Sequence, residues 1–298
     1  MRVLHIDTGR EMRGGQWQVL RLVGGLVEAG HEAVLLSPRG SPLFEKAAGR
    51  GLAPKPLGIV TLAREPALAD LIHAHDARGH SLAAIVGRAP LVVSRRVAFA
   101  IHANPASRWK YSRADHYIAV SEHAKGGLVK AGVPADKVSV VYDGVPLGEP
   151  ATGGRLILAP ATADPAKGAA LVRAAARIAG LEVRFSENLE EDLRDARMFV
   201  YITHQEGLGS AALLAMAAGV PVLASRVGGL QEIIEDGRSG VFTENHPEAI
   251  AAGMRLLAED EGLRRRLGEC ARERVREKLS VAAMVRGTLD VYTRILSC

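Results

Sequence analysis

Of the 298 residues of this chain, 48% are hydrophobic and 24% are charged, a balance that is ordinary for a folded protein with a substantial core. Only 4% are aromatic, which argues against a nucleic-acid binder that stacks bases on exposed rings. The formal net charge of +5 fits an anionic ligand, an anionic membrane surface, or simply arginines spread over solvated helix faces.

Cysteine is rare. Cys270 and Cys298 lie in sequence typical of helices, and their spacing fits neither a disulfide framework nor a zinc site. Residues 1–6 follow a strand pattern rather than that of a charged leader, and no run of about 18 apolar residues occurs. We therefore expect a cytoplasmic protein, either free or peripheral at the inner face of the membrane.

The first half of the chain alternates strand and helix patterns, which predicts an α/β unit with a doubly wound parallel sheet. Strands are expected at Arg2–Asp7, Glu32–Ser37, Leu57–Val60, Leu68–Ala74, Pro90–Ser94, Asp115–Val120 and Val138–Tyr142. Helices are expected at Gln16–Ala29, Pro42–Ala48 and Glu122–Ala131.

Polar residues gather after one of these strands. His73, His75 and Asp76 close the Leu68–Ala74 strand, and His80 follows in the next helix. Such a set could ligate a metal ion. However, no cysteine or further carboxylate joins it, and strand ends beside a cleft collect polar residues in any case. We therefore expect no metal here.

A basic pair ends the next strand. Arg95 and Arg96 are either ligand contacts or solvated charges. The segment Ala98–Arg113 that follows reads as a loose loop in which Trp109 is interleaved with basic and aromatic residues. This pattern fits the headgroup of an acceptor, a contact with an anionic membrane, or an ordinary surface loop with an amphipathic tryptophan.

A Gly-, Pro- and Thr-rich segment, Leu147–Gly154, divides the chain. We expect one domain over residues 1–146, a second over 147–279 and a further helix over 280–298. In the second half, strands are predicted at Arg155–Ala159, Leu181–Phe185, Met198–Thr203 and Pro221–Ser225. Helices are predicted after Lys167-Gly168 up to Ala179, and at Leu189–Asp195, Ser210–Ala218, Leu230–Glu235, His246–Ala258, Glu261–Lys278 and Ser280–Leu296.

Two glycine-punctuated loops follow neighbouring strands of the second half. They are His204–Gly209 and the pair Gly228-Gly229. Because parallel strands place their carboxyl ends at one edge of the sheet, both loops should present free N–H groups of helix N-termini at that edge. Such groups favour an anion, for example a diphosphate.

The stretch Val200–Phe242 closely resembles the nucleotide-sugar site of the retaining family-4 glycosyltransferases of the GT-B fold, the glycosyl transferases group 1. Their pattern runs roughly E-G-F-G-x-P-x-x-E-A-M-A-x-G-x-P-V-x-A-S, then G-G-x-x-E. The residues in register are Glu206, Gly207, Gly209, Ala215, Met216, Ala217, Gly219, Pro221, Val222, Ala224, Ser225, Gly228, Gly229 and Glu232. The resemblance covers nearly the whole chain. It implies two Rossmann-like domains facing a central cleft, with an acceptor-side N-terminal domain to which the last helix returns.

The resemblance also implies roles for single residues. Glu206 matches the glutamate that contacts the donor sugar, and Lys167 matches the lysine of the phosphate-binding turn G-R-x-x-x-x-K-G. Arg96 matches a position that often bears a histidine reaching the donor sugar. Leu214 stands where a second glutamate holds the ribose, and Thr162 stands where the turn has its arginine. The implied donor-binding residues are Gly14, Gly15, Gly207, Leu208, Gly209, Ser210, Leu214, Gly228 and Gly229.

One of two adjacent leucines should line the nucleotide pocket. Neighbouring helix positions point about 100° apart, so Leu213 and Leu214 cannot both face the core. We expect Leu213 to be the core residue and Leu214 to face the pocket, with weak donor affinity as the result.

By this resemblance the protein is a hexosyltransferase-like enzyme. It would move a sugar from a nucleotide-sugar donor to a glycan or glycolipid acceptor with retention, in the biosynthesis of lipopolysaccharide or another cell-surface glycan. We expect no cofactor and no metal, because Lys167 and helix N-termini can stabilise the departing diphosphate. The low aromatic content leads us to expect no nucleic-acid partner. Two alternatives stay open. The changes at Leu214 and Thr162 fit a degenerate GT-B binding protein or partner subunit without transfer activity, and a nucleotide-sugar epimerase of related architecture would share the cleft.

Overall fold

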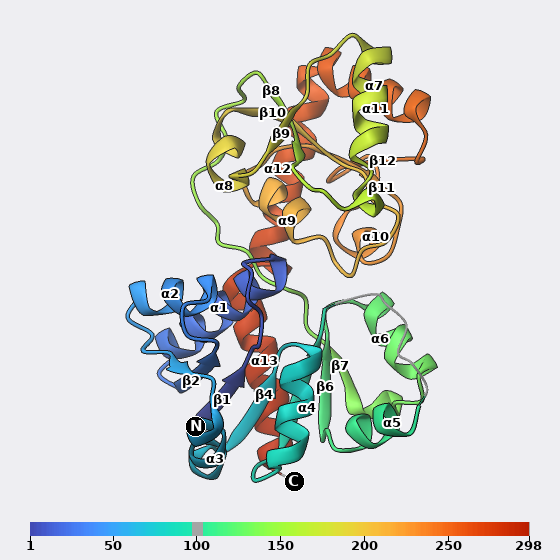
Figure 1. The fold of residues 1–298 in the computed structure, drawn as a ribbon. Helices are drawn as coiled ribbons and strands as arrows, with labels where there is room; N and C mark the ends of the chain where they lie inside the picture. Colours follow the sequence, from blue (N-terminus) through green and yellow to red (C-terminus); the bar gives the residue numbers. More distant parts are fainter. Residues whose placement is uncertain (97–103, 298) are drawn as a thin grey trace. The chain divides into compact units, whose positions relative to one another are not determined.

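The structure, a computed structural model, describes residues 1–96 and 104–297 and divides into two compact units (Figure 1). Unit 1 comprises Met1–Gly144 together with Val281–Cys298, and unit 2 comprises Val145–Ser280. Each unit is an α/β structure around its own parallel sheet. Among the described residues, no helix combines the length and the apolar character needed to cross a bilayer.

Unit 1 contains, within its described residues, a seven-stranded parallel sheet in the order β3-β2-β1-β4-β5-β6-β7. The strands are β1 (Arg2–Ile6), β2 (Glu32–Ser37), β3 (Lys55–Pro56), β4 (Leu71–Ala74), β5 (Leu91–Arg95), β6 (His116–Ala119) and β7 (Val138–Val140). The helices are α1 (Gly14–Glu28), α2 (Pro42–Gly49), α3 (Ile59–Arg64), α4 (Ala77–Val86), α5 (Pro105–Ser112), α6 (Glu122–Lys130) and α13 (Val281–Leu296), with 3-10 turns at Glu65–Leu68 and Ala135–Lys137.

The core of unit 1 joins the two ends of the chain. Apolar residues of β1, β2 and α1 pack together with Met284, Val291 and Tyr292 of α13. A Cβ atom added at Gly25 of α1 would lie only 2.6 Å from Val285 Cγ2, so the close approach of α1 and α13 requires a glycine there. The C-terminal helix is therefore an integral part of the N-terminal unit.

Unit 2 contains a five-stranded parallel sheet over residues 145–280, all of which the structure describes, in the order β12-β11-β10-β8-β9. The strands are β8 (Leu156–Pro160), β9 (Arg184–Ser186), β10 (Ala196–Tyr201), β11 (Val222–Ser225) and β12 (Val241–Thr243). The helices are α7 (Ala169–Ala179), α8 (Leu189–Asp192), α9 (Ser210–Ala217), α10 (Leu230–Ile233), α11 (Pro247–Glu259) and α12 (Glu261–Lys278), with 3-10 turns at Pro165–Lys167 and Leu193–Asp195.

The predicted α/β class, with a doubly wound parallel sheet in each half of the chain, is confirmed, whereas the following local predictions are wrong. The expected strand Leu57–Val60 does not form, because α3 begins at Ile59. Ile59 and Val60 are 89% and 78% exposed on that helix, so these apolar residues belong to no core. The expected loop Ala98–Arg113 contains helix α5. Pro105 occupies its first turn, and Asn104 Oδ1 accepts a hydrogen bond from Ser107 N at 2.8 Å, which is N-cap geometry. Residues 98–103 of that segment lie outside the described residues.

Candidate functional site

The carboxyl ends of β8 and β10 bring two loops of unit 2 together. These strands are parallel neighbours, and the loops after them lead into α7 and α9. Backbone and side-chain hydrogen bonds tie the loops to each other, from His204 N (2.9 Å) and Thr203 Oγ1 (3.3 Å) to Ala166 O. Gly168 packs closely on Ile202, where an added Cβ would lie 2.8 Å from the Ile202 carbonyl oxygen. Lys167 is therefore held beside the loop that carries Glu206.

Glu206 is the centre of a small polar network in unit 2. Its Oε2 atom accepts hydrogen bonds from Lys167 Nζ at 2.7 Å and from the Tyr201 hydroxyl at 2.5 Å. Its Oε1 atom accepts one from Gly207 N at 3.1 Å. Burial and the adjacent Glu206 carboxylate raise the pKa of Tyr201 well above its ordinary value, so this phenol stays protonated and donates. The Glu206 side chain is 14% exposed and remains accessible to a small ligand.

The second glycine turn packs directly on the Glu206 loop. A Cβ added at Gly229 would lie 2.2 Å from Gly207 O, and one added at Gly228 would lie 2.0 Å from Glu206 O. Gly228 also has φ +50°, a conformation that favours glycine. The two glycine turns therefore meet backbone to backbone at the sheet edge, a closer contact than the shared edge that the sequence predicts.

Helix α9 begins at Ser210, directly after Gly209, which has φ +108°. By contrast, α10 is shorter than the predicted Leu230–Glu235, because Ile234 is already extended with φ −104° and ψ 128°. Four residues are too few for a useful helix dipole. The free N–H groups at this edge therefore come from the N-termini of α7 and α9 rather than from α10.

Four further positions of this region have different environments. Leu213 is completely buried, whereas its neighbour Leu214 is only half-buried, so Leu213 takes the core position. Leu208 turns its side chain into the interior, with 2% exposed, and only its backbone can face a ligand. Thr162 Oγ1 accepts a hydrogen bond from Asp164 N at 3.1 Å and thus serves the turn before Lys167.

Unit 1 places Arg96, Gly15 and Asp76 around a pocket of about 330 Å³, whereas Gly14 begins α1 beside it. Arg96 Nε donates to Asp143 Oδ1 at 3.1 Å, and Arg96 Nη1 lies 3.2 Å from His75 Nδ1. The Arg96 side chain is 11% exposed and the Asp143 side chain 6%. Arg96 is therefore a largely buried, oriented cation rather than a solvated one.

Three buried histidines lie behind Arg96. Ring nitrogens of His5, His73 and His75 lie within 4.8 Å of one another, close enough to suggest a metal site. However, both nitrogens of His73 are hydrogen-bonded, to the Tyr292 hydroxyl at 2.5 Å and to Ser94 Oγ at 2.8 Å. His5 Nδ1 and His75 Nε2 bond each other at 2.9 Å.

Arg96 fixes the protonation of this cluster. An arginine can only donate, so His75 Nδ1 accepts, His75 Nε2 carries the proton and His5 Nδ1 accepts in turn. Burial and the Arg96 charge lower the pKa of His5 to about 3. Burial, neighbouring histidines and Arg96 hold the pKa values of His73 and His75 well below their usual range. A network of neutral, hydrogen-bonded histidines explains the cluster better than a divalent metal ion, because the Arg96 guanidinium would repel such an ion. The absence of a bound metal stays a prediction from the sequence.

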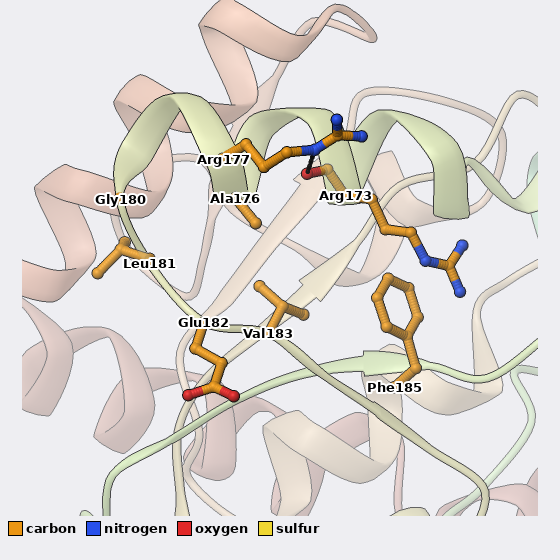
Figure 2. A pocket seen from close by; sticks show the side chains of 8 residues that line it. All are labelled: Arg173, Ala176, Arg177, Gly180, Leu181, Glu182, Val183 and Phe185. Carbon is orange, nitrogen blue, oxygen red and sulfur yellow. Dashed lines mark hydrogen bonds between the residues drawn. The ribbon is translucent and has the colours of Figure 1, made fainter.

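A second hollow, of about 550 Å³, lies on unit 2 at the far end of α7 from Lys167 (Figure 2). Arg173 Cζ sits 4.1 Å from the centre of the Phe185 ring, and Arg177 Nε donates to Arg173 O at 3.4 Å (Figure 2). This hollow borders β9, one of the two edge strands of the sheet. It contains none of the residues that the sequence singles out.

Each half of the chain matches a known protein family. Residues 12–149 match the family described as Glycosyltransferase Family 4, and residues 173–274 match Glycosyl transferases group 1. The chain carries both glycosyltransferase domains. The second of them contains Glu206 and the glycine turns, whereas Lys167 lies just before its matched range.

Individual curated proteins are similar to parts of this chain. The chain is 37% identical over 141 residues to a D-inositol 3-phosphate glycosyltransferase of Streptomyces avermitilis, covering 45% of this chain and 30% of that protein. It is 33% identical over 117 residues to an alpha-maltose-1-phosphate synthase of Mycolicibacterium smegmatis, covering 37% of this chain and 30% of that protein. The chain thus spans less than a third of the length of these curated relatives.

A solved structure shows the same fold. The Anabaena protein HepE, in complex with UDP and glucose, superimposes with a TM-score of 0.85 at 16% identity and covers 99% of this chain and all of that one.

The sequence missed three members of these networks. Tyr201 lies inside the predicted strand Met198–Thr203 and Asp143 precedes the predicted linker, so both read as structural residues. Asn245, which donates to Thr203 O at 2.9 Å and bonds Ser225 Oγ at 2.5 Å, lies outside the motif. Only the tertiary structure shows that Tyr201 orients Glu206 and that Asp143 orients Arg96.

Proposed function

We propose that this protein transfers a sugar from a nucleotide-sugar donor to an acceptor, with unit 2 binding the donor and unit 1 the acceptor. One observation carries the proposal: Lys167, Glu206 and two abutting glycine turns meet at the edge of the unit 2 sheet where α7 and α9 begin. The match to two glycosyltransferase families supports it, and so does the UDP in a structure of the same fold.

The chemistry follows from the charges at this edge. The bond between the sugar C1 and the phosphate oxygen breaks, and negative charge develops on the departing nucleoside diphosphate. Lys167 and the free N–H groups of α7 and α9 stabilise that charge. Glu206 Oε1 accepts a hydrogen bond at 3.1 Å from its own neighbour Gly207 N, and its remaining acceptor capacity receives a hydroxyl of the donor sugar.

We further propose that the transfer retains the anomeric configuration without a covalent sugar–enzyme intermediate. The Glu206 carboxylate is ion-paired with Lys167 and accepts a hydrogen bond from Tyr201, and both contacts make it a poor nucleophile. The acceptor oxygen then attacks C1 on the face that the diphosphate leaves, and its proton passes to the departing phosphate oxygen.

The chemical class of the acceptor and the cellular location of the reaction are proposed from the sequence. A glycan or glycolipid acceptor of the cell surface, lipopolysaccharide included, stays our prediction from the sequence, and so does a cytoplasmic site with peripheral membrane contact. The partly exposed Trp109 of α5, at 49%, is compatible with such a contact. The names of the two relatives point instead to phosphorylated sugars or cyclitols.

A binding protein without transfer activity is the second candidate, because Leu214 stands where a ribose-binding glutamate is expected. Incubation with radiolabelled nucleotide sugars separates the candidates. A glycosyltransferase releases labelled sugar to water or to an acceptor, an epimerase returns an isomerised nucleotide sugar, and a binding protein leaves the donor intact. Intact donor after long incubation with a broad set of acceptors would refute the enzyme proposal.

A further inference from the structure

Another pocket of unit 1, apart from the one around Arg96, is lined by two arginines. It has a volume of about 250 Å³ and lies where β1 and β2 end and α4 begins. Arg10 and Arg78 line it, and no acidic residue is among its described lining. Pockets that enclose a whole small ligand measure roughly 300–1,000 Å³, so this one fits a single group of a ligand and the atoms next to it.

Neither arginine has a counter-charge in the part of the chain that the structure describes. Both side chains are exposed, and neither forms a hydrogen bond or an ion pair there. Glu11, the neighbour of Arg10 in the sequence, is instead ion-paired with Arg13 at 2.6 Å. The pocket therefore gathers two positive charges that repel each other, and an anion bound to both would remove that repulsion.

Asp76 holds the two sides of the pocket together without pairing with either guanidinium group. Its carboxylate accepts hydrogen bonds from Thr8 N and Thr8 Oγ1 on one side and from Arg78 N and Gly79 N on the other. A Cβ added at Gly79 would lie 2.9 Å from Ile6 O, so α4 starts in close contact with the end of β1. The backbone on both sides of the pocket is therefore fixed by the fold, and this acid is already used by four donors.

The hydroxyl groups of the lining have no proton left for a ligand. Thr8 Oγ1 donates to Asp76 Oδ1 at 2.9 Å, and Ser81 Oγ donates to Ala77 O at 3.1 Å. Since a hydroxyl carries one proton, the two guanidinium groups are the side-chain donors that the described lining offers. Each can bind a phosphate or carboxylate group through two parallel hydrogen bonds. The lining thus favours an anion over a neutral, hydroxyl-bearing ligand.

The remaining described side chains of the lining are apolar and half-buried: Pro38, Leu57 and Leu82. Apolar walls with a few converging polar groups are typical of sites for small organic molecules. A free inorganic ion gains nothing from such walls, whereas the carbon-bound hydrogens of a sugar or cyclitol ring pack against them. The pocket therefore fits an anionic group that is attached to a carbon skeleton.

We propose that Arg10 and Arg78 form a binding site for the phosphate or carboxylate group of a sugar-like anion, whose ring lies against the apolar wall. The site goes beyond the proposed transfer, because its pocket contains none of the donor-binding residues and its occupancy is measured without a donor. Asp76 also lines the pocket around Arg96, so the two pockets are neighbours within unit 1.

The test uses matched ligands and matched variants. Calorimetric titrations of glucose 1-phosphate, glucose and inorganic phosphate are run on the wild type, Arg10→Gln, Arg78→Gln and the control Arg50→Gln. Arg50 is an exposed arginine of unit 1 that directly follows α2 and does not line this pocket. Because all three arginines are exposed, the variants should fold, and thermal unfolding checks this. A parallel flotation assay uses phosphatidylcholine vesicles with and without phosphatidylinositol, which presents a cyclitol phosphate on a lipid.

The expected result is that glucose 1-phosphate binds more tightly than inorganic phosphate and that glucose does not bind. The affinity for glucose 1-phosphate should fall roughly 10- to 100-fold in Arg10→Gln and in Arg78→Gln, on the scale of a charged hydrogen bond, and stay unchanged in Arg50→Gln. If only the phosphatidylinositol vesicles bind, and the same two variants lose that binding, the anion belongs to a lipid headgroup.

Several results would overturn the inference. They are binding of neither glucose 1-phosphate nor the phosphatidylinositol vesicles, equal affinities in all four proteins, an equal loss in all three variants, and binding of glucose or inorganic phosphate as tightly as glucose 1-phosphate. A UDP titration of the wild type is the separate check on unit 2. Failure of UDP to bind would count against the proposed function, whereas the glucose 1-phosphate titrations decide the anion site.

Discussion

Lys167 and Glu206 stand 39 positions apart in the chain, and they form an ion pair with 2.7 Å between Nζ and Oε2. The Tyr201 hydroxyl shares the same carboxylate oxygen at 2.5 Å. A diphosphate that binds beside Lys167 therefore has to share the ammonium with Glu206. That competition gives the pair its testable consequences.

Removal of the Lys167 charge should weaken donor binding. Lys167→Gln keeps most of the side-chain volume but removes a charged hydrogen bond, so the affinity for UDP should fall by about 1.5–3 kcal/mol. Lys278→Gln, an exposed lysine at the end of α12, is the matched control and should leave the affinity unchanged. Calorimetry measures both. Equal UDP affinities of the two variants would show that Lys167 does not contact the diphosphate.

A substitution at the half-buried Leu214 should strengthen UDP binding rather than weaken it. Leu214→Glu restores a ribose-binding carboxylate and should tighten UDP binding by about 1–2 kcal/mol. The adjacent Leu213→Glu is the contrast, because it places a charge in a fully buried site and should unfold unit 2. Thermal unfolding and calorimetry on both variants distinguish pocket from core. Unchanged UDP affinity in a folded Leu214→Glu protein would place the ribose elsewhere.

Transfer should proceed without a divalent ion. Lys167 and the N-termini of α7 and α9 supply the positive charge that a metal would otherwise bring. Turnover of a labelled nucleotide sugar should therefore be the same before and after dialysis against a chelator. Complete loss of turnover that magnesium or manganese restores would refute this prediction.

Acid should destabilise unit 1 through its buried histidines. Burial lowers the pKa of His80 to about 4 and that of His5 to about 3, from ordinary values of 6.5. Between these values and 6.5 the unfolded chain binds protons at these histidines and the folded unit does not, so acid favours unfolding. This stability is complete above about pH 6.5 and is lost as the pH falls toward 4. Asp7, whose pKa is raised by burial and by Asp76, acts in the opposite direction.

The measurement is the thermal midpoint at about pH 7.5 and about pH 5, on either side of the ordinary histidine pKa. The wild type should melt at a lower temperature at the lower pH, and His80→Gln should lose less than the wild type. His31→Gln, at a partly exposed position before β2, is the comparison variant. Equal losses in both variants would show that His80 does not couple folding to protons.

Much of this architecture is visible in the sequence because its signals are local. Alternating patterns predicted most strands of both sheets, and the motif from Glu206 to Glu232 located the glycine turns that pack at Gly229. The strand predicted at Leu57–Val60 is wrong because the apolar residues Ile59 and Val60 are exposed on α3. The spacing of apolar residues along the sequence does not by itself show whether they are buried. Helix α5 was missed because its polar composition hid the cap at Asn104.

The orienting residues were beyond sequence reasoning for another reason. Tyr201 serves Glu206 and Asp143 serves Arg96 only through contacts made in the folded unit, and neither residue type is unusual where it stands. His5 of β1 bonds His75, which directly follows the neighbouring strand β4, although 70 positions separate them. Such partnerships depend on strand order, which periodicity does not specify.

Backbone amide NMR during a UDP titration tests the donor site most directly. The proposed function predicts shift changes concentrated at Lys167, Gly207, Gly209, Ser210, Gly228 and Gly229, with none at Arg173 and Phe185 of the hollow in Figure 2. Spectra that stay unchanged at millimolar UDP, or changes confined to that hollow, would contradict the assignment of the glycine turns as the nucleotide site.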